Sequence, residues 1–168
     1  MNIFFLDFDT QKCAQYHCDK HVVKMILETA QLLCGVHHVT PQVTPQVPYK
    51  LSHKNHPCAI WTRESLSNYL YLCDLGLELC KEYTYRYGKT HSVETRLLNP
   101  LYLPPERIPL GTFSPPTPAM PDECKIPNDS LASYHKYYIE RKNHFAKWTK
   151  REIPIWYSQG LKVNNANL

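Results

Sequence analysis

Residues 17 to 34 read HCDKHVVKMILETAQLLC, and the fold can be argued outward from them. On a helix that turns by about 100° per residue, one narrow stripe collects five polar side chains: His17, His21, Lys24, Glu28 and Gln31. Nearly all of the remaining circumference is apolar. A surface helix usually has a polar face wider than its apolar face. The sequence therefore predicts a buried helix with a thin polar seam along one side.

Two interpretations of the polar seam are open. It is either the solvent-facing edge of a core helix or one wall of an active or ligand-binding site. We favour the second, because buried polar groups must be paired or used. Imidazole, amine, carboxylate and amide groups on successive turns suit acid–base chemistry and phosphate binding. The seam predicts catalytic residues at His17, His21, Lys24, Glu28 and Gln31.

The composition fits one globular domain. The chain has 168 residues, of which 43% are hydrophobic and 20% charged, and this is enough for one substantial core. No apolar run is long enough to cross a membrane, and no signal segment stands at the start. Seven cysteines without a C-x-x-C motif indicate reduced thiols. We expect a cytoplasmic protein.

Prolines divide the chain into helical parts and extended loops. Pro-rich loops are expected at about residues 38–56 and 100–128, the first of them containing the repeat VTPQVTPQVP. Residues 2–8 are expected to be a short strand or extended segment. Helices are predicted near 11–35 (as one helix or as two with a kink near Cys18), 57–87, 92–99 and 129–152, with Gly35 and Gly88 at helix ends. The prediction is an all-α, single compact domain over residues 1–168, with three to five helices.

Positive charge is concentrated at the C-terminal end. From Ser130 onward seven Lys or Arg stand against two Glu, while the whole chain has a net charge of +4. Basic and aromatic residues interleave on the predicted last helix, as phosphate contact and base stacking require. A basic tail can instead be only solubilising. The pattern predicts DNA-binding residues at Lys136, Arg141, Lys147, Trp148, Lys150 and Arg151, with DNA or a nucleotide as partner.

A second wall of the site is expected where the helix near residue 57 begins. Glu82 and Arg86 are spaced as an i,i+4 pair on an otherwise apolar face and are expected to form a buried ion pair. The predicted substrate-binding residues are Lys20, His53, Asn55, His56, Arg63 and Arg86.

The chemistry of the polar seam has several alternatives. His17 and His21 have the spacing of a two-histidine metal site, but no complete metal signature is present and Lys24 would repel a cation. We therefore predict neither a metal nor a cofactor. The Lys24 amine could act as a Schiff-base nucleophile. Alternatively, lysines of the seam hold phosphate while Glu28 or His21 transfers protons.

Several motifs, taken together, resemble a family of short, functionally uncharacterised proteins of tailed bacteriophages and other large DNA viruses. They are HCDKHVVKMILETAQLL, HKNHPCAIWTRES, EYTYRYGK, PAMPD and FAKWTKREIP. The resemblance covers nearly the whole chain. It implies a viral protein in the cytoplasm of an infected host cell.

The order of elements, ending in Pro154-Ile155-Trp156-Tyr157, is similar to the small all-α pyrimidine-dimer DNA glycosylases of the endonuclease V type from phages. The resemblance implies that Lys20 and Lys24 stand at the positions of the arginines on that family's first helix. Its essential glutamate would fall near His21 or Glu28. The family uses the amine of a small second residue exposed by removal of the initiator Met, whereas residue 2 here is Asn, after which Met is usually retained.

Together these features predict a viral enzyme that processes DNA or nucleotides, acting in glycosylase-like base excision or base processing. One alternative is a metal-dependent nuclease or phosphohydrolase. Another is a non-enzymatic viral protein that binds DNA or a host partner. The substrate base and the oligomeric state stay open at this point.

Overall fold

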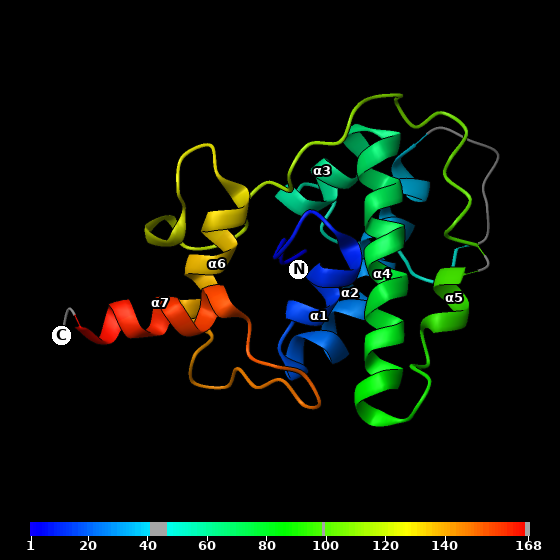
Figure 1. Ribbon diagram of the computed structural model, residues 1–168. Coiled ribbons are helices and arrows are strands. Elements are labelled where there is room, and N and C mark those ends of the chain that lie inside the picture. Colours follow the sequence, from blue (N-terminus) through cyan, green and yellow to red (C-terminus); the bar gives the residue numbers. More distant parts are fainter. Residues whose placement is uncertain (41–46, 99, 167–168) are drawn as a thin grey trace.

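The computed structural model describes residues 1–40, 47–98 and 100–166, and these residues are helical and irregular, without a β-strand (Figure 1). The helices are α1 (Thr10–Tyr16), α2 (Asp19–Val39), α3 (Pro57–Glu64), α4 (Leu66–Tyr87), α5 (Glu94–Leu98), the 3-10 helix η1 (Asp122–Cys124), α6 (Ser130–Arg141) and α7 (Ile155–Ala166). The all-α prediction is confirmed, with more helices than the three to five expected. Most of the repeat VTPQVTPQVP lies outside the described residues.

Helices α2 and α4 form the centre of the fold. They pack along one another, with α3 against both of them, α1 against α4, and α5 beside α4 (Figure 1). Met25 and Ile26 of α2 and Leu72 and Leu75 of α4 are fully buried between them. Burial of such side chains contributes about 1.5–3 kcal/mol each, so the apolar circumference of α2 holds this centre together.

The first helical stretch is two helices. The chain is extended at His17 and Cys18, and Asp9 caps α1 by accepting a hydrogen bond from the Lys12 amide at 2.8 Å. The end predicted at Gly35 is wrong, because α2 continues to Val39 and keeps its buried face through Val36.

The single helix predicted over 57–87 is also wrong. It breaks at Ser65, whose backbone is extended (φ −152°, ψ 155°) and whose hydroxyl accepts a hydrogen bond from the Asn68 amide at 3.1 Å. This cap starts α4 in a new direction. The predicted end at Gly88 is confirmed, with a left-handed φ of 64°.

The N-terminal segment is extended and inserted into the core. Ile3, Phe4, Phe5 and Leu6 are each at most 5% exposed. The extended segment predicted for residues 2–8 is thereby confirmed. In Figure 1 the N-terminus lies between α6 and the layer of α1 and α2.

The last predicted helix is shorter than residues 129–152, because α6 ends at Arg141. The irregular segment that follows packs on the start of α2: the Trp148 indole donates to the Tyr16 carbonyl at 2.8 Å, and the Asp19 amide donates to the Lys147 carbonyl at 2.8 Å. A continuous helix could not make these contacts. Beyond Pro154 a further helix, α7, packs on α6.

All seven cysteines are buried and free of disulfides, which agrees with the reduced thiols expected. Within the described ranges, no helix is both long and apolar enough to span a membrane.

Candidate active site at the start of the chain

The carboxylate of Glu28 lies against the start of the chain. Its Oε2 accepts a hydrogen bond from the Asn2 amide at 2.9 Å and lies 3.9 Å from the α-amine of Met1. Its Oε1 lies 3.2 Å from Nζ of Lys24, one turn earlier on α2. Glu28 itself is 8% exposed. We call Met1, Asn2, Lys24 and Glu28 the amine–carboxylate cluster.

His56 stands beside this cluster. Its Nδ1 accepts a hydrogen bond from the Cys58 amide at 3.2 Å and so caps α3. Burial lowers the pKa of His56, and the positive α-amine of Met1 and His53 lower it further, while Glu28 acts in the opposite direction. A neutral ring whose Nδ1 is an acceptor carries its proton on Nε2. His56 is therefore a neutral donor next to the amine.

The other residues of the predicted second wall lie in the turn before α3. His53 has a left-handed φ of 54°, and its ring centre is 6.5 Å from that of His56. Arg63 fixes this turn by donating to the Lys54 carbonyl at 2.6 Å, and Asn55 is exposed on it. The start of α3, with His56, therefore lies beside the part of α2 that carries Glu28.

The polar seam itself divides into two parts. Glu28 and Lys24 belong to the cluster, with Gln31 half-buried about a turn further on. His21 is buried, stacked on Phe4 with ring centres 4.0 Å apart, and its Nδ1 lies 2.5 Å from the Tyr138 hydroxyl. Burial lowers the pKa of His21 to about 2. This ring serves the packing between α2 and α6.

His17 lies before α2, where the chain is extended, and is fully buried. Its Nδ1 is 2.7 Å from the Cys13 carbonyl oxygen, while its Nε2 has no hydrogen-bond partner among the described residues. Burial lowers the pKa of His17 to about 4. The structure therefore separates His17 from the cluster to which the helical periodicity assigned it.

Three exposed lysines and one half-buried lysine lie on or near the N-terminal half of α2. Lys20 is exposed, with Nζ 4.8 Å from the ring centre of Phe145, and Lys142 donates to the Tyr137 hydroxyl at 3.0 Å. Lys147 is exposed in the segment that packs on Asp19. We call Lys20, Lys24, Lys142 and Lys147 the basic rim.

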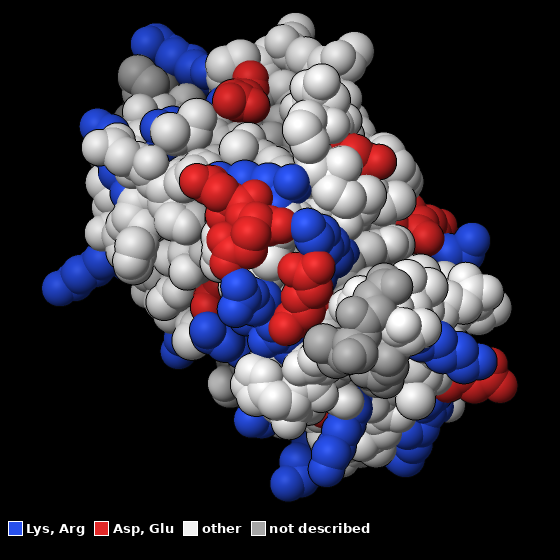
Figure 2. Space-filling model, turned by 90° about the vertical axis from the view of Figure 1, so that its left-hand side faces the viewer, with Lys and Arg blue, Asp and Glu red and all other residues white. Residues whose placement is uncertain are grey.

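Other predicted DNA-binding residues are engaged with acidic partners. Arg141 pairs with Glu123, and Lys136 donates to the Glu123 carbonyl at 2.5 Å and lies 3.9 Å from Glu140. Figure 2 shows acidic and basic side chains lying against one another on the face from which α7 projects. This face offers less free positive charge than the sequence suggested.

A buried ion network holds Arg86 and Arg151. The Glu82 carboxylate accepts a hydrogen bond from Nε of Arg86 at 2.8 Å and from Nε and Nη2 of Arg151, each at 2.9 Å. Nη1 of Arg86 also pairs with Asp19 at 2.9 Å. The predicted pair of Glu82 and Arg86 is thereby confirmed. Burial raises the pKa of Glu82, but the hydrogen bonds from Arg151 and Arg86 outweigh it and the net shift is downward.

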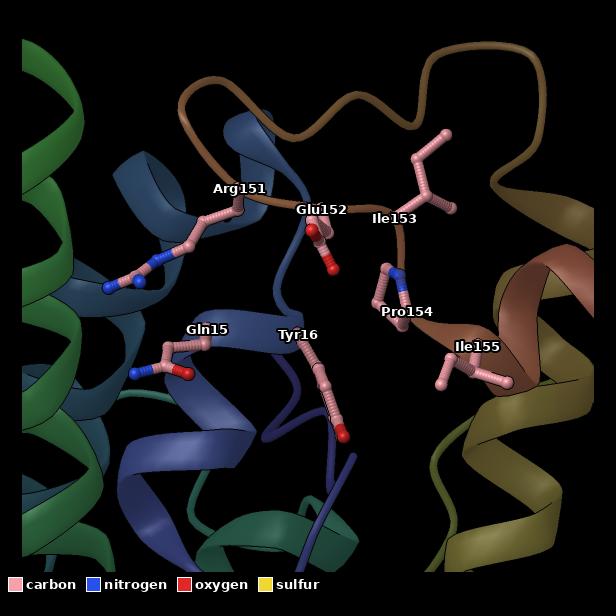
Figure 3. A pocket seen from close by; sticks show the side chains of 7 residues that line it. All are labelled: Gln15, Tyr16, Arg151, Glu152, Ile153, Pro154 and Ile155. Carbon is pink, nitrogen blue, oxygen red and sulfur yellow. The ribbon is translucent and has the colours of Figure 1, made fainter.

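A hollow of about 330 Å³ lies between the end of α1 and residues 151–155, away from the cluster (Figure 3). Glu152 points into it and Arg151 points away toward α4. Its lining comprises Gln15, Tyr16, Arg151, Glu152, Ile153, Pro154 and Ile155. None of the residues of the polar seam is among them.

Within the described ranges, no group of three or more His, Cys, Asp or Glu side chains is arranged to hold a metal ion. The sequence reasoning missed Met1 and Asn2 as site residues. Two signals pointed to them: the resemblance to glycosylases that use the amine of the second residue, and the apolar run of residues 3–6, which had to carry the start of the chain into the core.

Fold and site together define a small helical protein in which an α-amine and a carboxylate meet beside a basic rim. Residues 1–95 match the family described as pyrimidine dimer DNA glycosylase, and the chain belongs to this family. No curated protein and no solved structure matches the chain. Family membership confirms the resemblance to the phage glycosylases and supports a DNA glycosylase-like function, with DNA as substrate, for the N-terminal region.

Proposed function

We propose that the protein releases damaged pyrimidines from DNA by attack of its α-amine on the deoxyribose C1′, with Glu28 as acid–base catalyst. The observation that carries this proposal is the contact of Glu28 with the Asn2 amide at 2.9 Å and with the Met1 amine at 3.9 Å. A carboxylate at ion-pair distance from an amine can accept the proton that the amine loses on attack, once the two close to hydrogen-bond distance.

The step balances as follows. The amine nitrogen forms a bond to C1′, and the glycosidic bond breaks with its electron pair leaving on the base, which takes up a proton. Glu28 takes one of the two protons that the amine loses and passes it to the departing base, and the second goes to O4′ when the sugar ring opens. Opening of the sugar ring at O4′ then gives an imine between C1′ and the protein nitrogen. Water hydrolyses this imine, or loss of a C2′ proton expels the 3′ phosphate.

Either form of the N-terminus suits this geometry. With Met1 in place its amine lies 3.9 Å from Glu28, and removal of Met1 would leave the nitrogen of Asn2 at 2.9 Å. Lys24 is the competing nucleophile at 3.2 Å. Its side chain is 68% exposed, whereas that of Met1 is 4% exposed. Because hydration weakens an amine as a nucleophile, the α-amine is the better candidate.

The basic rim is the proposed phosphate contact. Lys20 lies on the first turn of α2, Lys142 and Lys147 lie at and after the end of α6, and their charges are not used in ion pairs among the described residues. Lysine amines of this kind supply sequence-independent affinity and orient the backbone of the DNA.

The test uses a duplex oligonucleotide with one cyclobutane pyrimidine dimer and the same duplex without it. The protein should cut the damaged strand at the dimer and leave the other duplex intact. Glu28→Gln should lower the cutting rate by about 10²–10⁴-fold, and Glu78→Gln, at a half-buried position of α4 outside the cluster, should leave it unchanged. Binding without cleavage of a glycosidic bond, in any damaged duplex, would instead indicate a DNA-binding protein.

A further inference from the structure

The half of the chain beyond the family match reaches into the candidate site. Tyr134 lies on α6, is fully buried, and donates its hydroxyl hydrogen to Oδ1 of Asn2 at 2.8 Å. The same hydroxyl accepts a hydrogen bond from the Ala119 amide at 3.3 Å. Residues 119 and 134 are both outside residues 1–95.

These contacts fix the orientation of the Asn2 side chain. Its Nδ2 donates to the Ala119 carbonyl at 2.7 Å, while its Oδ1 also accepts from the Ile3 amide at 2.9 Å. Because an acceptor faces Nδ2 and donors face Oδ1, only one orientation of the Asn2 side-chain amide satisfies all of these hydrogen bonds. Burial raises the pKa of Tyr134 well above its ordinary value, so the hydroxyl remains a donor.

The backbone of the same residue touches the carboxylate. The Asn2 amide donates to Glu28 Oε2 at 2.9 Å, and the Met1 amine precedes it by one residue. Tyr134 itself contacts neither Glu28 nor the amine in any recorded hydrogen bond among the described residues. Its effect on the site must therefore pass through Asn2.

We infer that Tyr134 is a positioning residue for the reaction: by holding Asn2 it sets the distance between the nucleophilic amine and Glu28. This inference rests on the proposed function. Misplacement of reacting groups by about 1 Å can slow a reaction about 10²-fold, so loss of one buried hydroxyl here should have a kinetic effect larger than its effect on folding.

The experiment measures single-turnover cutting at saturating protein, the protein concentration at half-maximal rate, and the rate of borohydride trapping on abasic-site DNA. Tyr134→Phe should lower the cutting and trapping rates at least 10-fold and leave the half-saturating concentration unchanged. Tyr71→Phe is the matched control, because it removes a buried hydroxyl that donates to the Asp7 carbonyl at 3.0 Å, outside the cluster. It should leave both rates unchanged.

Asn2→Leu removes the half-buried side chain that Tyr134 holds, and so tests whether Tyr134 acts through Asn2. Leu is large, so Met1 is expected to be retained, as it is expected to be with Asn. Tyr134→Phe should have no further effect on either rate in this background. Equal effects of Tyr134→Phe in the parent and in Asn2→Leu would overturn the inference, as would unchanged rates in Tyr134→Phe. If Tyr134→Phe does not fold, a normal trapping rate in Asn2→Leu overturns it. A parent protein that cleaves no glycosidic bond overturns the proposed function as well, so the two failures are distinct.

Discussion

Glu82 binds Arg151 through both carboxylate oxygens, each at 2.9 Å, and so ties the segment after α6 to the middle of the fold. The same carboxylate receives Arg86, whose side chain is fully buried. Glu82 thus joins α4 to the segment that contains Arg151, 69 residues later in the sequence. Residues 142–154 hold their irregular path because of this pairing and the contacts of Asp19.

The first prediction concerns this carboxylate. Glu82→Gln removes one of the two carboxylates that pair with the buried Arg86, leaving only Asp19, and also the carboxylate that holds Arg151. Breaking a buried pair costs about 3–5 kcal/mol. The free energy of unfolding in urea should fall by that amount. Glu78→Gln removes one carboxylate of an exposed pair with Lys81 and should change it by less than about 1 kcal/mol. Equal stability of both variants would contradict a structural role for Glu82.

The second prediction separates folding from DNA contact at Trp148. The side chain is 8% exposed and its indole donates to the Tyr16 carbonyl at 2.8 Å. Trp148→Ala should therefore destabilise the protein by about 3–5 kcal/mol, read as a lower midpoint of thermal unfolding. DNA affinity measured well below that midpoint should stay within about 2-fold of the parent, because stacking on a base would instead cost about 1–3 kcal/mol. A loss of affinity in the folded variant would return Trp148 to the DNA interface.

The central helix could be predicted because its signal is local. The apolar circumference of α2 and the position of Glu28 on it follow from the spacing of residues alone, as does the end of α4 at Gly88. The end of α6 at Arg141 has no such local signal. It depends on the Trp148 and Lys147 contacts with the start of α2, which lie about 130 residues away in the sequence.

The candidate site was predictable only in part for a similar reason. Helical periodicity placed His17 and Glu28 on one stripe, but the chain breaks at Cys18 and His17 falls outside α2. The partner of Glu28 is Asn2, 26 residues earlier, and no periodicity relates the two. Tertiary contact alone brings the start of the chain to the carboxylate.

The third prediction is a loss of stability in acid. The pKa of the buried His17 is lowered from 6.5 to about 4, so between these values the unfolded chain binds more protons than the folded one. The stability contributed by the neutral ring is fully present above pH 6.5 and is lost as the pH falls toward 4. The loss from this residue at pH 4 is about 3 kcal/mol.

Urea unfolding at pH 7 and pH 4 tests this. His17→Gln should show a difference in unfolding free energy between the two pH values that is smaller than that of the parent by about 3 kcal/mol. His144→Gln, an exposed position, should keep the difference of the parent. A parent protein as stable at pH 4 as at pH 7 would exclude a neutral, buried His17.

The fourth prediction compares two sets of cations for DNA binding. Lys20 and Lys147 of the basic rim are exposed and outside the ion pairs among the described residues, whereas Lys136 and Arg141 are paired with Glu140 and Glu123. Each phosphate contact contributes about 0.9 to the slope of the logarithm of the association constant against the logarithm of salt concentration.

The double variant of Lys20 and Lys147 to Ala should therefore reduce this slope by about 2. The double variant of Lys136 and Arg141 to Ala should change it by less than about 1, because those cations already have partners. Binding of undamaged duplex DNA, measured between about 50 and 200 mM salt, gives both slopes. The opposite order would move the DNA interface to the face where α6 packs on η1, which carries Glu123. Equal slopes in all three proteins would mean that neither set contacts phosphate.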